Sequence, residues 1–198
     1  MIIQNAQAFL PDHTFRKKDI RIENERISEI ADELMPGDGE EVVDAKGSRV
    51  IPGLVDIHLH GAMRQDFCNA GESLDSIVQY ELQNGIVAIC ATTMSLDEKT
   101  LTECVERISA HRNNRGAEIV GINLEGPFIS VEKCGAQDPK NIIPASSEMF
   151  RRLNRASGNR IKFVDLAPET EGAMAFIEEC KDETVISVTH TKCDYETA

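Results

Sequence analysis

The amino-acid sequence predicts an α/β fold, and two observations support that prediction. From Ile51 onward, short apolar segments alternate with amphipathic ones, which is the pattern of parallel strands covered on both faces by helices. Before that point, residues 1–50 contain short strand-like segments separated by turn residues such as Pro36-Gly37-Asp38-Gly39. We therefore expect a β-rich N-terminal subdomain at residues 1–50 and an α/β domain at residues 51–198.

The expected elements follow from local patterns. Apolar residues recur at helical spacing in three segments and more weakly in a fourth. Ser95 and Glu98 have the spacing of a capping box, which predicts the start of a helix, and Gly85 is a plausible helix end. The expected strands are 1–6, 20–22, 26–30, 42–43, 53–57, 86–91, 119–124, 161–166 and 185–188, and the expected helices are 74–82, 101–108, 147–154 and 173–180.

The number of strands limits the architecture of the second domain. The chain has 198 residues, and once its first 50 are set aside it is much shorter than the roughly 250 residues of a complete (β/α)8 barrel. Five strands are recognisable, so the domain is either a small open sheet or about the first five strands of such a barrel.

Composition narrows the possible partners and compartments. Acidic residues outnumber basic ones by 34 to 21, for a net charge of −13, which argues against nucleic acid or an anionic membrane as a partner. The N-terminus lacks the pattern of a signal peptide and no apolar run is long enough to span a membrane, so we expect a cytoplasmic protein. The six cysteines form no C-x-x-C pair and are expected to be reduced thiols.

Two histidines lie at the end of the first strand of the α/β domain. His58 and His60 are two residues apart, and side chains at this spacing in a strand point to the same side, where a metal ion could bind both. Such a pair taken alone is also typical of histidines that hydrogen-bond to neighbouring loops.

Two further strands end in residues that bind metals. Glu125 ends the third expected strand of this domain, and His190 follows the fifth. Because the carboxyl ends of parallel strands lie on one side of the sheet, these residues should meet His58 and His60 there. Taken singly, Glu125 could be a helix-start acid and His190 a capping histidine. Together the four residues predict a divalent metal site.

Several segments resemble a known enzyme family in order and spacing. Leu124-Glu125-Gly126-Pro127-Phe128, with the segment 133–137 after it, is the most specific of them. The other segments are Pro52–Gly61 with its two histidines, Leu166-Ala167-Pro168-Glu169 and Thr189-His190-Thr191. Over essentially the whole chain, the sequence resembles the N-acetylglucosamine-6-phosphate deacetylases of the amidohydrolase superfamily, whose fold is a metal-dependent (β/α)8 barrel.

The resemblance implies roles for named residues. Glu125 and His190 would bind the catalytic divalent metal, zinc or iron. His58 and His60 would build a second site beside it, with Glu125 between the two sites, so that the centre would hold one or two ions. Ala136 and Gln137 would contact substrate, although relatives carry histidine where Gln137 stands. The family also uses a further histidine and a general acid/base aspartate on later strands, so we expect a truncated chain with little activity of its own.

The implied reaction is hydrolysis of the acetamide of N-acetylglucosamine 6-phosphate to glucosamine 6-phosphate and acetate. The partners would be this phosphorylated amino sugar and a second copy of the chain in a dimer. Two alternatives remain open. One is another amidohydrolase, dihydroorotase- or dipeptidase-like, although those more often bridge two metals with a modified lysine. The other is a non-catalytic half-barrel that serves as a binding or assembly module.

Overall fold

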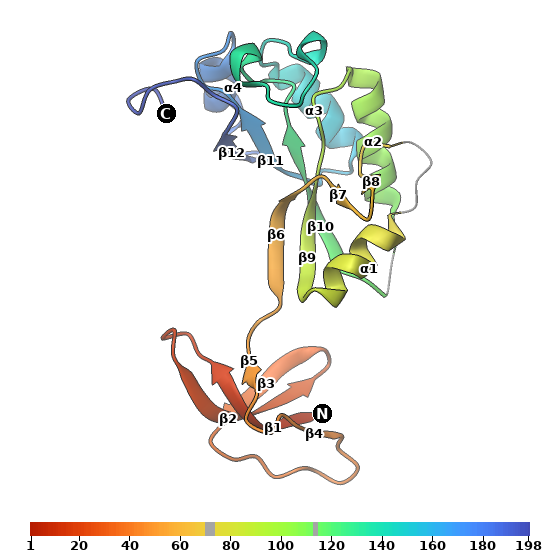
Figure 1. Cartoon of the computed structure of the whole chain (residues 1–198), viewed down its shortest axis with the longest axis vertical. Coiled ribbons are helices and arrows are strands. Elements are labelled where there is room, and N and C mark those ends of the chain that lie inside the picture. The colour runs from red at the N-terminus through yellow and green to blue at the C-terminus, as the bar shows by residue number, and fades with distance from the viewer. Residues whose placement is uncertain (70–73, 113–114) are drawn as a thin grey trace. The chain divides into compact units, whose positions relative to one another are not determined.

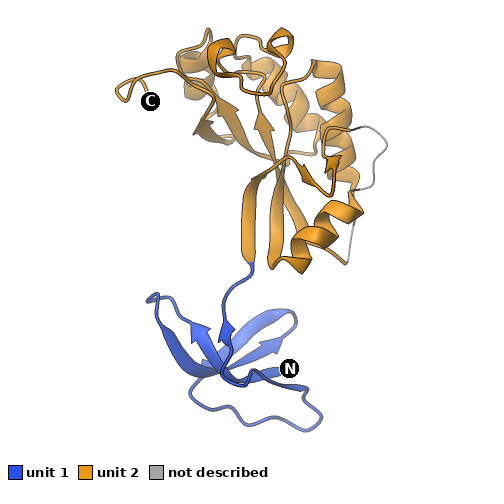
Figure 2. Cartoon of the chain, in the orientation of Figure 1, with its two compact units in different colours: residues 1–53 blue, residues 54–198 orange. Residues whose placement is uncertain are grey.

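The chain divides into two compact units, residues 1–53 and 54–198 (Figure 2). The computed structural model describes residues 1–69, 74–112 and 115–198. The sequence-based division into two domains at residue 50 stays a prediction.

The first unit is a small β-sheet, as its turn-rich sequence predicts. Strands β3, β2 and β1 are antiparallel neighbours, while β4 and β5 pair with β1 in parallel. The buried Asp19 carboxylate accepts hydrogen bonds from the backbone amides of Asn5 (2.9 Å) and Leu34 (3.0 Å), so it satisfies two donors inside the unit. The strands are β1 Ile2–Phe9, β2 Phe15–Glu23, β3 Arg26–Ala31, β4 Val42–Asp44 and β5 Arg49–Val50.

The second unit contains a curled parallel sheet of five strands in the order β12-β11-β10-β9-β6 (Figure 1). This half-barrel confirms the predicted fold class. Its strands are β6 Leu54–Leu59, β9 Ile86–Thr92, β10 Glu118–Glu125, β11 Ile161–Leu166 and β12 Val185–Val188. The other elements are the short strands β7 Gly61–Ala62 and β8 Gln65–Asp66, the helices α1 Asp75–Gln83, α2 Glu98–Ala110, α3 Ser147–Ala156 and α4 Ala173–Cys180, and the 3-10 turns η1 Val131–Lys133 and η2 Pro139–Asn141.

The ends of two helices test the expected capping signals. Helix α1 ends before Gly85, whose positive φ of 86° and hydrogen bond to the carbonyl of Leu82 (3.0 Å) are those of a terminating glycine. The predicted capping box is wrong: Asp97, not Ser95, caps α2 by accepting the amide of Thr100 (3.1 Å). Ser95 is instead buried and donates its amide to Gln137, a long-range contact that no local pattern reveals.

The core of the second unit lies between the helices and the sheet. Helix α2 contributes Leu101, Val105 and Ile108 at helical spacing, and these side chains are fully buried in one cluster with residues of the strands. Phe176 of α4 packs against Phe128 and Phe150, with ring centroids 5.4 and 5.6 Å apart. This packing holds the loop after β10 against the outer helices.

Replacing Phe176 with alanine should therefore destabilise the second unit. Removing a buried aromatic ring costs about 3–5 kcal/mol, since it leaves a cavity. Met174→Ala in the same helix is the control because Met174 is 61% exposed, and it should change the free energy of unfolding by about 0.5 kcal/mol or less. Urea unfolding of both variants measures the difference, and equal losses would contradict this packing.

Candidate metal centre

Three histidines converge on one buried carboxylate at the carboxyl ends of the strands. Glu125 is the last residue of β10 and is 2% exposed. Its Oε2 lies 2.6 Å from Nε2 of His58 and 3.0 Å from Nε2 of His60, and its Oε1 lies 2.8 Å from Nε2 of His190. The structure thus brings together all four residues for which the sequence predicts metal binding.

The neighbouring backbone explains how His58 and His60 reach the same carboxylate. The amide of Leu59, between them, donates to Thr92 Oγ1 on the adjacent strand (2.9 Å). Gly61 follows directly, and a Cβ there would lie 2.0 Å from the carbonyl oxygen of Gln65. Only glycine allows the chain to turn so closely into the β7–β8 hairpin after the second histidine.

His190 is oriented by the long loop after β10. Its Nδ1 lies 2.7 Å from the carbonyl oxygen of Lys133, and a carbonyl only accepts, so this nitrogen carries the proton. In the neutral ring, Nε2 then presents a lone pair to Oε1 of Glu125. Two acceptors face each other at 2.8 Å, and this contact is favourable when the ring is protonated or a cation is shared.

These donors fit a divalent metal ion. One nitrogen each from His58 and His60 and one oxygen of Glu125 lie within 4.8 Å of one another, and among the described residues no other group of three or more His, Cys, Asp or Glu side chains does so. Glu125 Oε2 and His60 Nδ1 are buried and make no regular hydrogen bond to any described residue. Imidazole and carboxylate ligands suit zinc and other first-row metals.

Electrostatics within the cluster shift two pKa values in opposite directions. Burial raises the pKa of Glu125, but the close contact with His60 and the charges of the three histidines outweigh it and lower that pKa below its ordinary value. The close contact with the Glu125 carboxylate raises the pKa of His60 despite desolvation. Without a metal the centre therefore favours a carboxylate paired with a protonated histidine.

Gln137 lies against the carboxylate rather than at the surface. Its Nε2 donates to Oε1 of Glu125 and its Oε1 accepts the amide of Ser95 (2.6 Å), so both ends of the buried amide are used within the protein. The neighbouring Ala136 is exposed. The predicted contact of both residues with substrate stays a prediction.

Sequence reasoning missed two polar residues of this centre. Asn123 on β10 and Asp165 on β11 are both buried, and Glu125 and Asp165 are register partners on the two strands. Burial raises the pKa of Asp165 above its ordinary value, outweighing nearby groups that lower it. Asp165 could have been noticed in the sequence as an acidic residue within the apolar segment Ile161–Leu166, one position before the end of a predicted strand.

Gly126 is required by the turn that follows Glu125. Its φ is +67°, and a Cβ there would lie 2.1 Å from Oγ of Ser95. Gly126→Ala should therefore weaken zinc binding as well as destabilise the protein, because the clash moves Ser95 and, with it, Gln137. Gly158→Ala is the control, since Gly158 has nearly the same φ, +66°, with open space around it.

Gly158→Ala is expected to cost about 1–2 kcal/mol of unfolding free energy from backbone strain alone and to leave zinc affinity unchanged. Calorimetric zinc titration and urea unfolding of the two variants separate the effects. If both variants bind zinc equally well, the turn does not position the centre.

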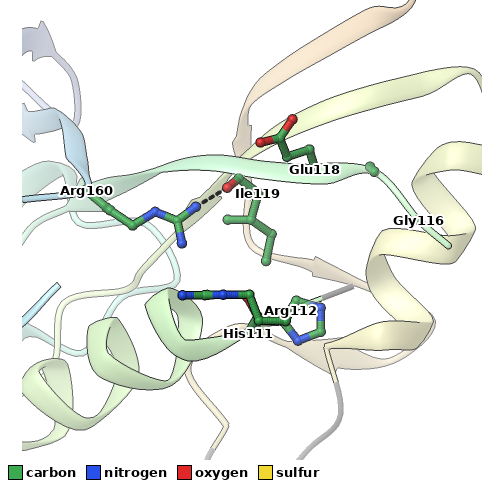
Figure 3. A pocket seen from close by; sticks show the side chains of 7 residues that line it. His111, Arg112, Gly116, Glu118, Ile119 and Arg160 are labelled. Carbon is green, nitrogen blue, oxygen red and sulfur yellow. Dashed lines mark hydrogen bonds between the residues drawn. The ribbon is translucent and has the colours of Figure 1, made fainter. Parts of the chain in front are cut away.

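A separate pocket of about 540 Å³ lies beside the start of β10, away from the metal centre (Figure 3). Arg160 donates to the carbonyls of Ser109 (3.3 Å) and Ile119, and Arg112 also donates to Ser109 (2.7 Å). Ser109 lies in the last turn of α2, so these arginines compensate the negative end of that helix.

The strand ends of this half-barrel thus gather a His-x-His pair, a glutamate and a further histidine, a set of donors that could hold a divalent metal ion. The chain is similar throughout to the N-terminal half of N-acetylglucosamine-6-phosphate deacetylases, which confirms the resemblance. The Bacillus subtilis deacetylase is 29% identical over 202 residues, covering 98% of this chain and 51% of the relative. The crystal structure of the Mycobacterium smegmatis deacetylase has a TM-score of 0.85 at 26% identity, covering 100% of this chain and 52% of that one.

A relative that is named for a different sugar is also similar to this chain. The N-acetylgalactosamine-6-phosphate deacetylase of Escherichia coli O157:H7 is 27% identical, covering 73% of this chain and 39% of the relative. No family model matches the sequence. The chain spans about half the length of the curated relatives first named above. Among the described residues, no helix is long and apolar enough to cross a membrane.

Proposed function

We propose that this chain supplies the metal-binding half of an enzyme that hydrolyses the acetamide of N-acetylglucosamine 6-phosphate to glucosamine 6-phosphate and acetate. The observation that carries the proposal is the convergence of His58, His60 and His190 on Glu125 at the strand ends. The names of the relatives support the substrate.

The residues of the centre have distinct tasks in this reaction. One carboxylate oxygen of Glu125 faces His58 and His60, and the other faces His190. One or two zinc or iron ions would therefore be held around this shared carboxylate. A bound divalent cation lowers the pKa of water and polarises an amide carbonyl. The loop at 126–146 orients His190 through Lys133 and holds Glu125 through Gln137.

The same loop is the proposed border of the sugar site. Ala136 is exposed beside the buried Gln137, so substrate would meet the backbone and methyl group of Ala136 directly. It would reach the Gln137 amide only by displacing one of the contacts of that amide with Glu125 or Ser95. The protein has a net charge of −13, so binding a phosphorylated sugar requires basic groups concentrated near the pocket. The cytoplasm is the proposed compartment, because phosphorylated amino sugars are metabolites of the cell interior.

A chimera tests the proposed reaction. Residues 1–198 would replace the matched half of the Bacillus subtilis deacetylase, and the folded, zinc-loaded protein would be assayed with three sugars. We expect hydrolysis of N-acetylglucosamine 6-phosphate in preference to its galacto epimer and to unphosphorylated N-acetylglucosamine, because the remote phosphate helps position the amide. A folded, zinc-loaded chimera that hydrolyses none of them would contradict the proposal and favour a non-catalytic module.

We also propose that the isolated chain forms a dimer through the end strands of its sheet. Among the described residues, β6 and β12 each pair with one other strand, and apolar side chains on both are exposed, including Val55 (58%) and Val185 (55%). Unpaired strand edges favour association. Val185→Lys should shift the mass from light scattering toward the monomer, whereas Val131→Lys, also 55% exposed but in η1, should not. A wild-type chain with the mass of a monomer in light scattering would contradict the proposed dimer.

A further inference from the structure

Asp165 is a buried acid for which the metal ligands themselves give no role. It is 1% exposed, and neither carboxylate oxygen makes a hydrogen bond of regular geometry to any described residue. Burial raises its pKa above the ordinary value, and the nearby Ser187 and Asn123 side chains offset this only in part. An ionised group left this way costs considerable free energy, so its retention calls for a function.

Asp165 lies beside Nδ1 of His58, the ring nitrogen that is not turned toward Glu125. Nδ1 of His58 lies 3.3 Å from Oδ2 of Asp165 and also 3.3 Å from Nδ2 of Asn123. The two neighbours favour opposite tautomers of the ring. The Asn123 amide group donates and favours a bare Nδ1, whereas the Asp165 carboxylate accepts and favours a protonated Nδ1.

The side-chain amide of Asn123 cannot flip so that its oxygen accepts a proton from His58. Its Nδ2 also donates to the backbone carbonyl of Ile57 (3.2 Å), and that contact fixes the orientation of the amide. When the proton of His58 is on Nδ1, Asp165 is therefore the acceptor available to it among the described residues.

The tautomer of His58 determines whether the residue can bind a metal ion through the nitrogen near Glu125. A proton on Nε2 suits the contact of 2.6 Å with the Glu125 carboxylate, but a metal ligand needs a lone pair on that nitrogen. In the neutral ring the proton must then be on Nδ1. One proton changes position on the ring and none is lost from His58.

We propose that Asp165 is a positioning residue: its carboxylate accepts the Nδ1 proton of His58 and so presents Nε2 as a metal ligand. This inference rests on the metal centre of the proposed function. It assigns a role to an acid outside the ligand group, and it explains why an uncompensated carboxylate is retained next to Glu125 in the sheet.

Asp165→Asn and Asp165→Leu test the role with zinc titrations in the presence of a competing chelator. Outer hydrogen-bond partners of metal ligands are worth about 10–100-fold in affinity, so we expect a loss in that range, larger for leucine because asparagine retains a neutral acceptor. Lys162→Gln is the control, since Lys162 is exposed near the start of the same strand, β11, and it should bind zinc as the wild type does.

A structural role and a positioning role predict different behaviour of the metal-free protein. Removing a buried carboxylate without hydrogen bonds should leave Tm unchanged or raise it, whereas a residue needed only for packing would lower Tm and zinc affinity together. Nitrogen-15 NMR of His58 gives a second reading: the zinc-loaded wild type should carry the proton on Nδ1, and Asp165→Leu should show a mixture of tautomers.

The outcomes separate this inference from the proposed function. If the wild type binds zinc and both Asp165 variants bind it equally well, the positioning role is wrong while the metal centre stands. If the variants lose affinity as expected but the chimera hydrolyses no acetylated sugar, the proposed reaction is wrong while the positioning role stands. A wild-type chain that binds no zinc overturns both.

Discussion

Glu125→Gln is expected to abolish tight zinc binding, with a loss of affinity of more than about 100-fold. Removing a residue that only hydrogen-bonds to a metal ligand already lowers metal affinity by about 10–100-fold. The effect should be larger for Glu125, because its carboxylate faces all three histidines. The amide keeps the size of the side chain but loses the charge. One of its two ends would also present a donor where an acceptor is needed.

Glu118→Gln is the matched control for this substitution. Glu118 begins the same strand, β10, and is exposed at the end far from the centre. Elemental analysis after dialysis, together with a chelator titration, should show full occupancy for Glu118→Gln and little zinc for Glu125→Gln. Retention of zinc by Glu125→Gln with wild-type affinity would show that the carboxylate is not a ligand.

The positions of the four predicted ligands could be inferred from sequence because topology alone brings them together. His58, Glu125 and His190 each lie at or just after the end of a recognisable apolar strand. In a parallel sheet, the ends of successive strands lie along one rim, whatever the details of packing. The prediction thus needed the strand type and the residue order, and no side-chain conformation.

Asp165 and Gln137 could not be assigned in this way. The position of Asp165 next to His58 depends on the register of β10 with β11, which includes an irregularity between Ile122 and Asn123. Gln137 reaches Glu125 only because the loop after β10 folds back and bonds to Ser95. Local sequence patterns carry no information on such register and loop closure.

Protons and zinc should compete for the centre, so the stabilisation by zinc is expected to grow as the pH rises. A histidine must be neutral to bind the metal, and the raised pKa of His60 moves that requirement above the ordinary histidine value of about 6.5. Below that range, apparent affinity should fall by about tenfold per pH unit for each ligand histidine that must release a proton.

The metal-free protein should respond to pH in the opposite direction. Because the pKa of His60 is raised in the folded state, its contribution to stability is fully present below the unfolded value and is lost as the pH rises through the folded value. The pKa of Glu125 is lowered, so its contribution is present above the unfolded value and is lost as the pH falls through the folded value. The pair therefore stabilises the metal-free chain most in mildly acidic solution, between these limits.

The difference in Tm between zinc-loaded and chelator-treated protein reports the apparent zinc affinity, since a ligand that binds only the folded state adds stability according to that affinity. We expect this difference to widen steadily from about pH 5.5 to pH 8, because zinc affinity rises as the ligand histidines release their protons. Glu125→Gln removes both the ligand and the ion pair, so its difference should be small at every pH. A wild-type difference that stays constant, or shrinks as the pH rises, would show that histidine protonation does not control this centre.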